Sequence, residues 1–368
     1  MARLNDLRLA LVGPLPPPAG GMANQVRQLA ELLAESGAHV ELVQTNAAYR
    51  PSWLGRLPVL RALARLLPYL ASLWRAAGRN QLMHVLANSG WSWHLFAAPA
   101  VWIAYLRGCP VLVNYHGGEA EAFLTRSRGL ISFSLSRTGL LTVPSAFLQR
   151  VFAAQGFKAS IVPNVVDLAL FRFRDEGVST DGDKQIAPHL VVLRNLEPIY
   201  DNASALRAFA LVRERWPQAQ LSVAGSGPEL AALQALVTEL KLDESVRFCG
   251  RLNREGIARL LSEADISLNP SLADNMPVSV LEALACGVPV VSTRVGGIPD
   301  LLQDGVSALL VPPADPAALA QAALELIEDA ALRQRLREGG RVVVNGCSWA
   351  LVGPRLAQCY ERTLAGAH

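Results

Sequence analysis

The stretch LRLALVGPLPPPAGGMANQVRQLAELLAESGAHVELVQT, residues 7–45, sets out the fold. An apolar run leads into a loop rich in proline and glycine, and apolar residues at helical spacing follow the loop. Gly37 suits the end of this helix, because glycine readily adopts the left-handed backbone that closes many helices. A second apolar run comes next, so the order strand, loop, helix, strand predicts a βαβ unit of a parallel sheet.

The same alternation continues along the chain and predicts two domains. Residues 171–186 are polar, charged and rich in turn-forming residues, and we interpret them as a linker between two series of βα units. At 368 residues the chain also exceeds what one hydrophobic core usually serves. We therefore predict an α/β fold of two Rossmann-like, doubly wound domains, 1–170 and 171–349, facing each other across a cleft. A C-terminal helix at about 350–368 could pack back on the first domain.

Composition places the chain among globular proteins, with 51% apolar and 18% charged residues. Its five cysteines are scattered and form no CxxC pair, which is typical of reduced thiols in a cytoplasmic protein. The N-terminus does not have the pattern of a signal peptide. The longest apolar run, residues 95–106, is shorter than the roughly 20 residues of a membrane span. We expect a cytoplasmic chain without a membrane-spanning segment.

The residues most informative about function lie within NPSLADNMPVSVLEALACGVPVVSTRVGGIPDLLQDGVSALLVPP. Pro277 fits the first turn of a helix, where its missing N–H costs nothing, and Asn275 can cap that helix. Asp274 then lies just before the helix and Glu282 lies inside it. Because a helix N-terminus favours anions, this pattern predicts a phosphate site beside two carboxylates. The carboxylates could accept hydroxyls from a ribose and from a sugar.

This region resembles the retaining GT-B glycosyltransferases of family four, and the resemblance runs over nearly the whole chain. That family has two glutamates separated by seven residues, followed by G.PVV and a GG turn. Asp274 stands where the first glutamate is expected and is one methylene shorter. The resemblance implies that a nucleotide sugar binds to the C-terminal domain and that the acceptor binds to the N-terminal domain. We also expect that no cofactor or metal is needed, because no pair of carboxylates at a strand end is available to hold a metal. The matching residues are Glu282, Gly287, Pro289, Val290, Val291, Gly296 and Gly297.

The resemblance also implies roles for individual residues. His116, at the end of a predicted strand, corresponds to the histidine that contacts the transferred sugar, and Asp274 would hold the hydroxyls of that sugar. Glu282 would hold the ribose. Arg194 would neutralise the leaving diphosphate, although the alignment could instead place Asn195 there. The other predicted donor-binding residues are Gly20 and Gly21, Gly225 and Gly227 in a strand-end G.GP, and Asn275, Met276 and Pro277.

One departure from the family concerns the diphosphate. Where family members present a second cation, a lysine, this chain has Ile199, Tyr200 and Asp201. Either another basic residue substitutes, or tyrosine and backbone donors contribute more, or the enzyme is slow. A DxD-like pair, Asp181 and Asp183, lies in the predicted linker rather than at the end of a buried strand, so we predict no metal site.

Charge is distributed unevenly along the chain. Residues 1–170 have fifteen Lys and Arg against seven Asp and Glu, whereas the remainder has nineteen against twenty-four. Residues 54–79 contain no carboxylate, and helical spacing gathers an arginine stripe, Arg61, Arg65, Arg75 and Arg79. Opposite it lie Leu63, Leu66, Leu67, Leu70, Leu73 and Trp74.

Two interpretations of this helix stay open: an ordinary helix packed on its sheet, or a helix lying on anionic lipid. The second would suit a glycan or lipid-linked acceptor from bacterial-type surface polysaccharide synthesis, used by a protein that is peripheral on the inner face of the cytoplasmic membrane. No nucleic-acid partner is expected. Two rival functions remain, a nucleotide-sugar 2-epimerase on the same fold and a degenerate subunit that binds a nucleotide sugar without catalysis.

Overall fold

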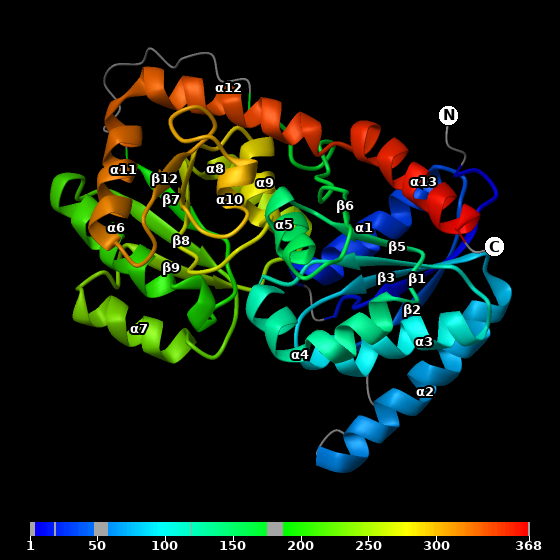
Figure 1. The fold of residues 1–368 in the computed structure, drawn as a ribbon. Coiled ribbons are helices and arrows are strands. Elements are labelled where there is room, and N and C mark those ends of the chain that lie inside the picture. Colours follow the sequence, from blue (N-terminus) through cyan, green and yellow to red (C-terminus); the bar gives the residue numbers. More distant parts are fainter. Residues whose placement is uncertain (1–3, 18–19, 48–57, 119, 175–186, 367–368) are drawn as a thin grey trace. The chain divides into compact units, whose positions relative to one another are not determined.

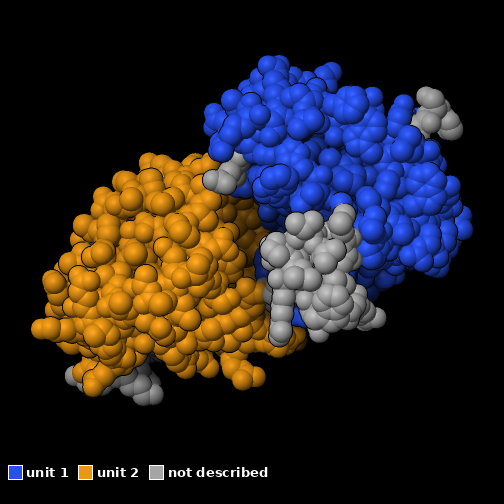
Figure 2. Space-filling view, turned by 90° about the horizontal axis from the view of Figure 1, so that it is seen from below, with its two compact units in different colours: residues 1–165, 349–368 blue, residues 166–348 orange. Residues whose placement is uncertain are grey.

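The computed structural model divides into two compact units, which Figure 2 colours separately. Unit 1 comprises residues 1–165 and 349–368, and unit 2 comprises residues 166–348. The structure describes residues 4–17, 20–47, 58–118, 120–174 and 187–366, and for residues 58–64 it describes the backbone only. Each unit is built on a six-stranded parallel sheet with helices on both faces, as predicted from the repeated βα pattern.

The sheet of unit 1 has the order β2-β1-β3-β4-β5-β6 (Figure 1). All of its neighbouring strands are parallel. Every residue of β3 and β4 is buried, because these central strands are covered on both faces. The strands are β1 (Arg8–Gly13), β2 (His39–Gln44), β3 (Leu82–Ala87), β4 (Val111–Tyr115), β5 (Leu140–Val143) and β6 (Ser160–Ile161).

Two apolar cores lie on opposite faces of this sheet. One is shared with α2 to α5 and the other with α1 and α13. The last helix of the chain, α13, therefore completes unit 1. The helices are α1 (Gly21–Glu35), α2 (Pro58–Arg79), the π-helix η2 (Trp93–Ala97), α3 (Ala98–Leu106), α4 (Ala120–Leu135), α5 (Ala146–Ala154) and α13 (Trp349–Ala365).

Unit 2 repeats the plan with the strand order β12-β11-β10-β7-β8-β9, again all parallel. Its strands are β7 (His189–Val192), β8 (Gln220–Ala224), β9 (Val246–Gly250), β10 (Ile266–Asn269), β11 (Val290–Thr293) and β12 (Leu309–Val311). Its helices are the 3-10 helix η3 (Pro198–Tyr200), α6 (Asn202–Arg215), α7 (Leu230–Glu239), α8 (Arg254–Glu263), α9 (Val278–Ala285), α10 (Ile298–Leu301), α11 (Pro316–Glu328) and α12 (Ala330–Gly346).

The division between the units falls earlier than the change in composition. It lies between Val165 and Val166, whereas the predicted boundary followed Leu170. Phe171, the first residue of the predicted linker, is fully buried in the core of unit 2, and both terminal nitrogens of Arg174 donate to backbone carbonyls of that unit. Both residues belong to folded unit 2, Phe171 through its apolar core and Arg174 through hydrogen bonds to the backbone. The rest of the predicted linker lies outside the described residues.

Helix α2 faces the sheet with a narrower apolar side than its sequence predicted. Tyr69 and Leu73 are buried in the core, but Leu67 and Trp74 are 62% and 47% exposed. At helical spacing these two residues lie about 100–120° around the axis from Leu73, beyond the sector that the sheet covers. Leu67 and Trp74, which the sequence places opposite the arginine stripe, are therefore not packed on the sheet, whereas Tyr69 and Leu73 are.

Candidate active site

The loop between β10 and α9 carries the first predicted carboxylate. Helix α9 begins at Val278, because Pro277 has an extended ψ of 121° and occupies the N-cap position without a side-chain cap. The expectation that Pro277 lies in the first turn is wrong, and so is the expectation that Asn275 caps the helix, since Asn275 precedes the N-cap by two residues. The backbone N–H of Asn275 instead donates to Asp274 Oδ1 at 2.9 Å.

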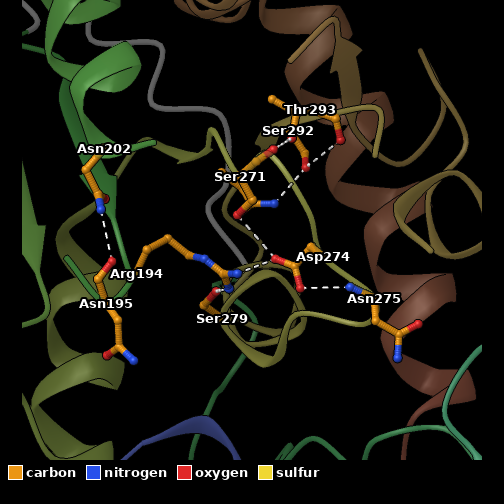
Figure 3. A network of polar contacts seen from close by, with 10 residues as sticks. Arg194, Asn195, Asn202, Ser271, Asp274, Asn275, Ser279, Ser292 and Thr293 are labelled. Carbon is orange, nitrogen blue, oxygen red and sulfur yellow. Dashed lines mark hydrogen bonds and ion pairs between the residues drawn. The ribbon is translucent and has the colours of Figure 1, made fainter. Parts of the chain in front are cut away.

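Arg194 and Asp274 form an ion pair at the carboxyl ends of β7 and β10 (Figure 3). Both side chains are nearly buried, at 10% and 12% exposure. Ser271 Oγ also donates to Asp274 Oδ2, at 3.3 Å, and Arg194 Nη1 donates to Ser279 Oγ, at 3.2 Å, in the first turn of α9. The predicted diphosphate-binding cation and sugar-binding carboxylate therefore lie together at a helix N-terminus and neutralise each other in the free protein.

Two of the three residues that replace the family's lysine support this pair, and the third caps a helix. The Ile199 carbonyl accepts the N–H of Leu272, which ties η3 to the loop that carries Asp274. The Tyr200 ring lies 4.2 Å from the guanidinium carbon of Arg194, and burial raises the pKa of its hydroxyl. Asp201 caps α6 by accepting from the Ser204 N–H. The segment thus holds Arg194 in place without contributing a second positive charge.

Glycines set the distance between the loops around Arg194. A Cβ on Gly225 would lie 1.9 Å from the Arg194 carbonyl oxygen, and one on Gly227 would lie 2.1 Å from the Leu196 carbonyl oxygen. The backbone carbonyl of Asn195 accepts a hydrogen bond from Asn202 Nδ2, at 2.9 Å. These predicted donor-binding residues therefore have a clear local role: they pack the strand ends tightly enough to fix Arg194.

The GG turn after β11 does the same for Asp274. Gly296 has a φ of +53°, and a Cβ there would lie 1.9 Å from the Asp274 carbonyl oxygen. The Gly297 N–H donates to the same carbonyl oxygen at 3.1 Å. Only glycine combines this backbone conformation with so close an approach, so the turn fixes the loop in front of α9.

Glu282, the second predicted carboxylate, is buried in the interior of α9. Burial raises the pKa of its carboxyl group to about 8, although the Arg254 guanidinium opposes the shift. Arg254, which is also buried, donates to Asp167 Oδ2 at 2.9 Å. Glu282 is thus a largely protonated carboxyl group at neutral pH, next to an arginine that is already paired.

His116 follows β4 in unit 1 and lines a pocket within that unit. Burial lowers its pKa to about 4, so the imidazole is neutral at pH 7. Its Nε2 has no hydrogen-bond partner among the described residues, and the same is true of Gln28 Nε2 and Asn114 Oδ1, which also line the pocket. These atoms are a donor, an acceptor and a ring nitrogen able to serve as either, a set suited to hydroxyl groups.

Three other predicted donor-binding residues have less specific surroundings. Gly20 and Gly21 stand at the start of α1, and a Cβ on either would meet nothing within 4 Å. The Met276 side chain packs in the apolar core of unit 2, so contact with a donor would have to come from its backbone.

Comparison with known proteins identifies the family. A family model described as glycosyltransferase family 4 matches residues 19–170, and one described as glycosyl transferases group 1 matches residues 187–329. The chain belongs to glycosyltransferase family 4. Its relatives include an N-acetyl-alpha-D-glucosaminyl L-malate synthase from Bacillus anthracis, 25% identical over 88% of this chain and 89% of that protein. A phosphatidyl-myo-inositol mannosyltransferase from Mycobacterium tuberculosis is 26% identical over 95% and 94% of the two chains.

Solved structures agree on the fold of this glycosyltransferase. A sucrose-phosphate synthase from Thermosynechococcus elongatus superposes with a TM-score of 0.77 at 22% identity, covering 98% of this chain and 99% of that one. Anabaena HepE in complex with UDP gives 0.73 at 17% identity, covering 96% and 100%. The two parallel sheets are thus those of the GT-B fold, as predicted. The glycosyltransferase uses a nucleotide-sugar donor, and its relatives are transferases, which does not favour the epimerase alternative.

Sequence reasoning missed several residues around the glycosyltransferase's carboxylates. Ser271 and Ser279 contact the Arg194–Asp274 pair, and Arg254 lies beside Glu282. Ser279 could have been found, since it lies in the first turn of the helix that was expected to bind an anion. Arg251 donates to Ser226 Oγ at 3.1 Å and so provides a second cation at a neighbouring strand end.

Metal-binding and membrane-spanning features are both absent from the described parts of the glycosyltransferase. These parts contain no group of three or more His, Cys, Asp and Glu side chains arranged to hold a metal ion. They also contain no helix with both the length and the apolar character needed to cross a bilayer. The pair Asp181 and Asp183 lies outside the described residues.

Proposed function

We propose that this glycosyltransferase moves a sugar from a nucleoside-diphosphate donor, with retention of its anomeric configuration and without a metal ion, onto a glycan or lipid-linked acceptor of bacterial-type surface polysaccharide synthesis. The main support is the Arg194–Asp274 ion pair at the N-terminus of α9. It provides the cation that a diphosphate needs and the carboxylate that sugar hydroxyls need, in one place.

Donor binding then proceeds by an exchange of partners. The guanidinium of Arg194 turns from Asp274 to the diphosphate, whose negative charge also faces the free N–H groups of α9. Asp274 is released to accept hydroxyls of the sugar, and Glu282 forms hydrogen bonds with those of the ribose. As the bond to the sugar breaks, Arg194 stabilises the charge that develops on the leaving diphosphate. His116, neutral at pH 7, contributes a hydrogen bond to the sugar rather than a charge.

The nucleotide is proposed to be a uridine diphosphate. Three structures of Anabaena HepE, which shares the fold, contain UDP, UDP with glucose, or UDP-glucose. A UDP-sugar panel is therefore the first choice for a test.

The direct test is a transfer assay with purified protein, UDP-sugars and a membrane-lipid extract, carried out in excess chelator. We expect acceptor-dependent release of UDP that Arg194→Gln reduces by about 10²-fold, the typical cost of losing one donor to a developing negative charge. NMR of the product should show the anomeric configuration of the donor. Donor consumption without acceptor would support epimerisation, binding without turnover would support the non-catalytic subunit, and dependence on added Mg²⁺ or Mn²⁺ would contradict the metal-free mechanism.

We also propose that the enzyme works as a peripheral protein on the inner face of the cytoplasmic membrane. The support is the basic character of unit 1, although the arginine stripe is less free than its sequence suggested. Arg79 forms an ion pair with Glu41 at 2.9 Å, Arg65 is only partly exposed, and the Arg61 side chain lies outside the described residues. Of the four, Arg75 is exposed without an acidic partner in the described chain.

A further inference from the structure

Unit 1 carries an exposed surface in which apolar side chains and arginines alternate over three neighbouring helices. Helices α2, α3 and α4 pack in sequence on one face of the sheet (Figure 1). We call their outer face the aromatic–arginine surface, and it consists of Leu67, Trp74, Arg75, Tyr105, Leu106, Arg107, Leu130, Phe133 and Arg137. Its six apolar and aromatic side chains are between 47% and 66% exposed. Exposed apolar side chains gathered in this way are typical of a binding surface.

The arginines of this surface lie on its aromatic rings. The guanidinium carbon of Arg107 is 4.9 Å from the ring centre of Trp74, which joins the end of α3 to α2. Arg137 lies 4.3 Å from the Phe133 ring and 4.2 Å from that of Trp102, and so joins α4 to α3. Each cation is thus held at the surface beside an aromatic ring. Side chains that combine an apolar body with a polar or charged end, such as Trp, Tyr and Arg, are favoured at the boundary between lipid and water.

The charge of the surrounding chain is almost entirely positive. From residue 42 to residue 166 the sequence contains two carboxylates, Glu119 and Glu121, against twelve lysines and arginines. A second copy of the chain would place arginines opposite arginines on this surface, so self-association is disfavoured. An anionic bilayer complements both features, because its headgroups attract the arginines and its interface accepts the aromatic rings.

We propose that the aromatic–arginine surface docks this enzyme onto anionic membrane, with Leu106, Leu130 and Phe133 entering the headgroup region. This rests on the proposed function at a membrane, but it assigns the contact to α3 and α4 as well as α2 and makes it partly apolar. Binding through the arginine stripe alone would vanish as salt screens it, whereas buried apolar side chains keep part of the binding at high salt.

The test is co-sedimentation of the full chain with vesicles of phosphatidylcholine, with and without phosphatidylglycerol, at low and high salt. The charge variant Arg107→Gln/Arg137→Gln should bind the anionic vesicles about tenfold or more weakly, since each arginine near such a surface contributes severalfold. The apolar variant Leu106→Ser/Phe133→Ser should lose the fraction that survives high salt. The matched control is Arg207→Gln/Val342→Ser in unit 2, where both side chains are exposed, and it should bind like wild type.

A second measurement uses wild type and one conservative variant that keeps an aromatic ring. Lipids brominated in the acyl chain should quench part of the wild-type tryptophan fluorescence, and Trp74→Phe should remove much of that quenching. The proposal would be overturned if wild type did not bind anionic vesicles, or if the charge and apolar variants both bound them as wild type does. A dimer seen by sedimentation velocity that the surface variants dissociate while vesicles are not bound would overturn it as well. UDP release from the same preparations in detergent tests the transfer activity separately.

Discussion

In the free enzyme Asp274 holds the guanidinium of Arg194, the group that the proposed mechanism assigns to the donor diphosphate. Both side chains are nearly buried, and a buried ion pair that loses one partner leaves an uncompensated charge. In the proposed mechanism, a diphosphate can therefore bind only after Arg194 has released Asp274. The shorter side chain of aspartate, compared with the family's glutamate, is compatible with this contact, because Asp274 is held by Ser271 and the Asn275 N–H on its other sides.

Removing the competing charge should strengthen the binding of free nucleotide while it weakens catalysis. We expect Asp274→Asn to bind UDP about tenfold or more tightly, since the diphosphate then neutralises an otherwise unpaired Arg194. Transfer should fall, because the sugar loses a charged acceptor. Isothermal titration calorimetry of the variant and of wild type measures the difference. Unchanged or weaker UDP binding by a folded Asp274→Asn protein would mean that the ion pair does not have to open.

Glu282 should make the stability of unit 2 depend on pH. Its pKa is about 8 in the folded protein against an ordinary value of 4.5, so the folded state holds a proton that the unfolded state loses. The stabilising contribution of the neutral carboxyl group is complete below the unfolded pKa and disappears as pH rises toward the folded pKa. Relative to Glu282→Gln, the free energy of unfolding should fall by roughly 3 kcal/mol between about pH 5 and pH 8.

Denaturant unfolding at a series of pH values provides this comparison. Glu239→Gln, on the exposed side of α7, is the matched control and should follow wild type. A Glu282→Gln curve parallel to that of wild type across the whole range would show that Glu282 is not a buried protonated acid.

At the scale of elements, the loops at the strand ends depend on glycine for their spacing. Gly225→Ala would force a methyl group to within 1.9 Å of the Arg194 carbonyl oxygen, and the neighbouring atoms are backbone that cannot swing away. We expect a loss of about 2–4 kcal/mol in stability and weaker UDP binding, because Arg194 would move with its loop. Gly346→Ala, where a Cβ meets nothing, is the control for thermal melting and calorimetry. Normal UDP affinity in Gly225→Ala would separate this glycine from the positioning of Arg194.

The sequence was sufficient to locate the helices and strands, but it predicted the residues at which they begin and end less accurately. Periodicity located β1 and α1 because apolar burial repeats locally. The start of α9 was misplaced by one residue, since it depends on the ψ of Pro277, which the residue type leaves open. The resemblance pointed to Arg194, Asp274 and Glu282 as separate ligand-binding groups. Its sequence pattern could not predict that Arg194 and Asp274 pair, because that contact spans eighty residues and depends on how two loops pack.

At the scale of the molecule, local composition did not predict which residues are buried, because burial depends on tertiary contacts. Phe171 and Arg174 looked like linker but are held by unit 2. Trp74 is one of the apolar residues that the sequence places opposite the arginine stripe of α2, and it is 47% exposed. The chain nevertheless divides into two units with separate cores, and the nucleotide-binding residues of the proposal lie in unit 2. UDP should therefore stabilise unit 2 in preference to unit 1.

The return of α13 to unit 1 can be tested through one buried contact. His84 on β3 is fully buried, and its Nδ1 lies 2.8 Å from the Tyr360 hydroxyl of α13. Burial lowers the pKa of His84 to about 3, so the ring is neutral and the hydrogen bond joins two uncharged groups. Tyr360→Phe keeps the ring but leaves a buried nitrogen without a partner, which costs about 1–3 kcal/mol. The calorimetric transition of unit 1 should move to lower temperature, whereas the UDP-dependent shift of unit 2 should persist. Tyr105→Phe, which removes a hydroxyl from an exposed ring, should change neither transition. Tyr360→Phe could instead lower the transition temperature of unit 2 and leave that of unit 1 unchanged. In that case α13 would stabilise unit 2 rather than unit 1, and the division of the chain into these two units would have to be abandoned.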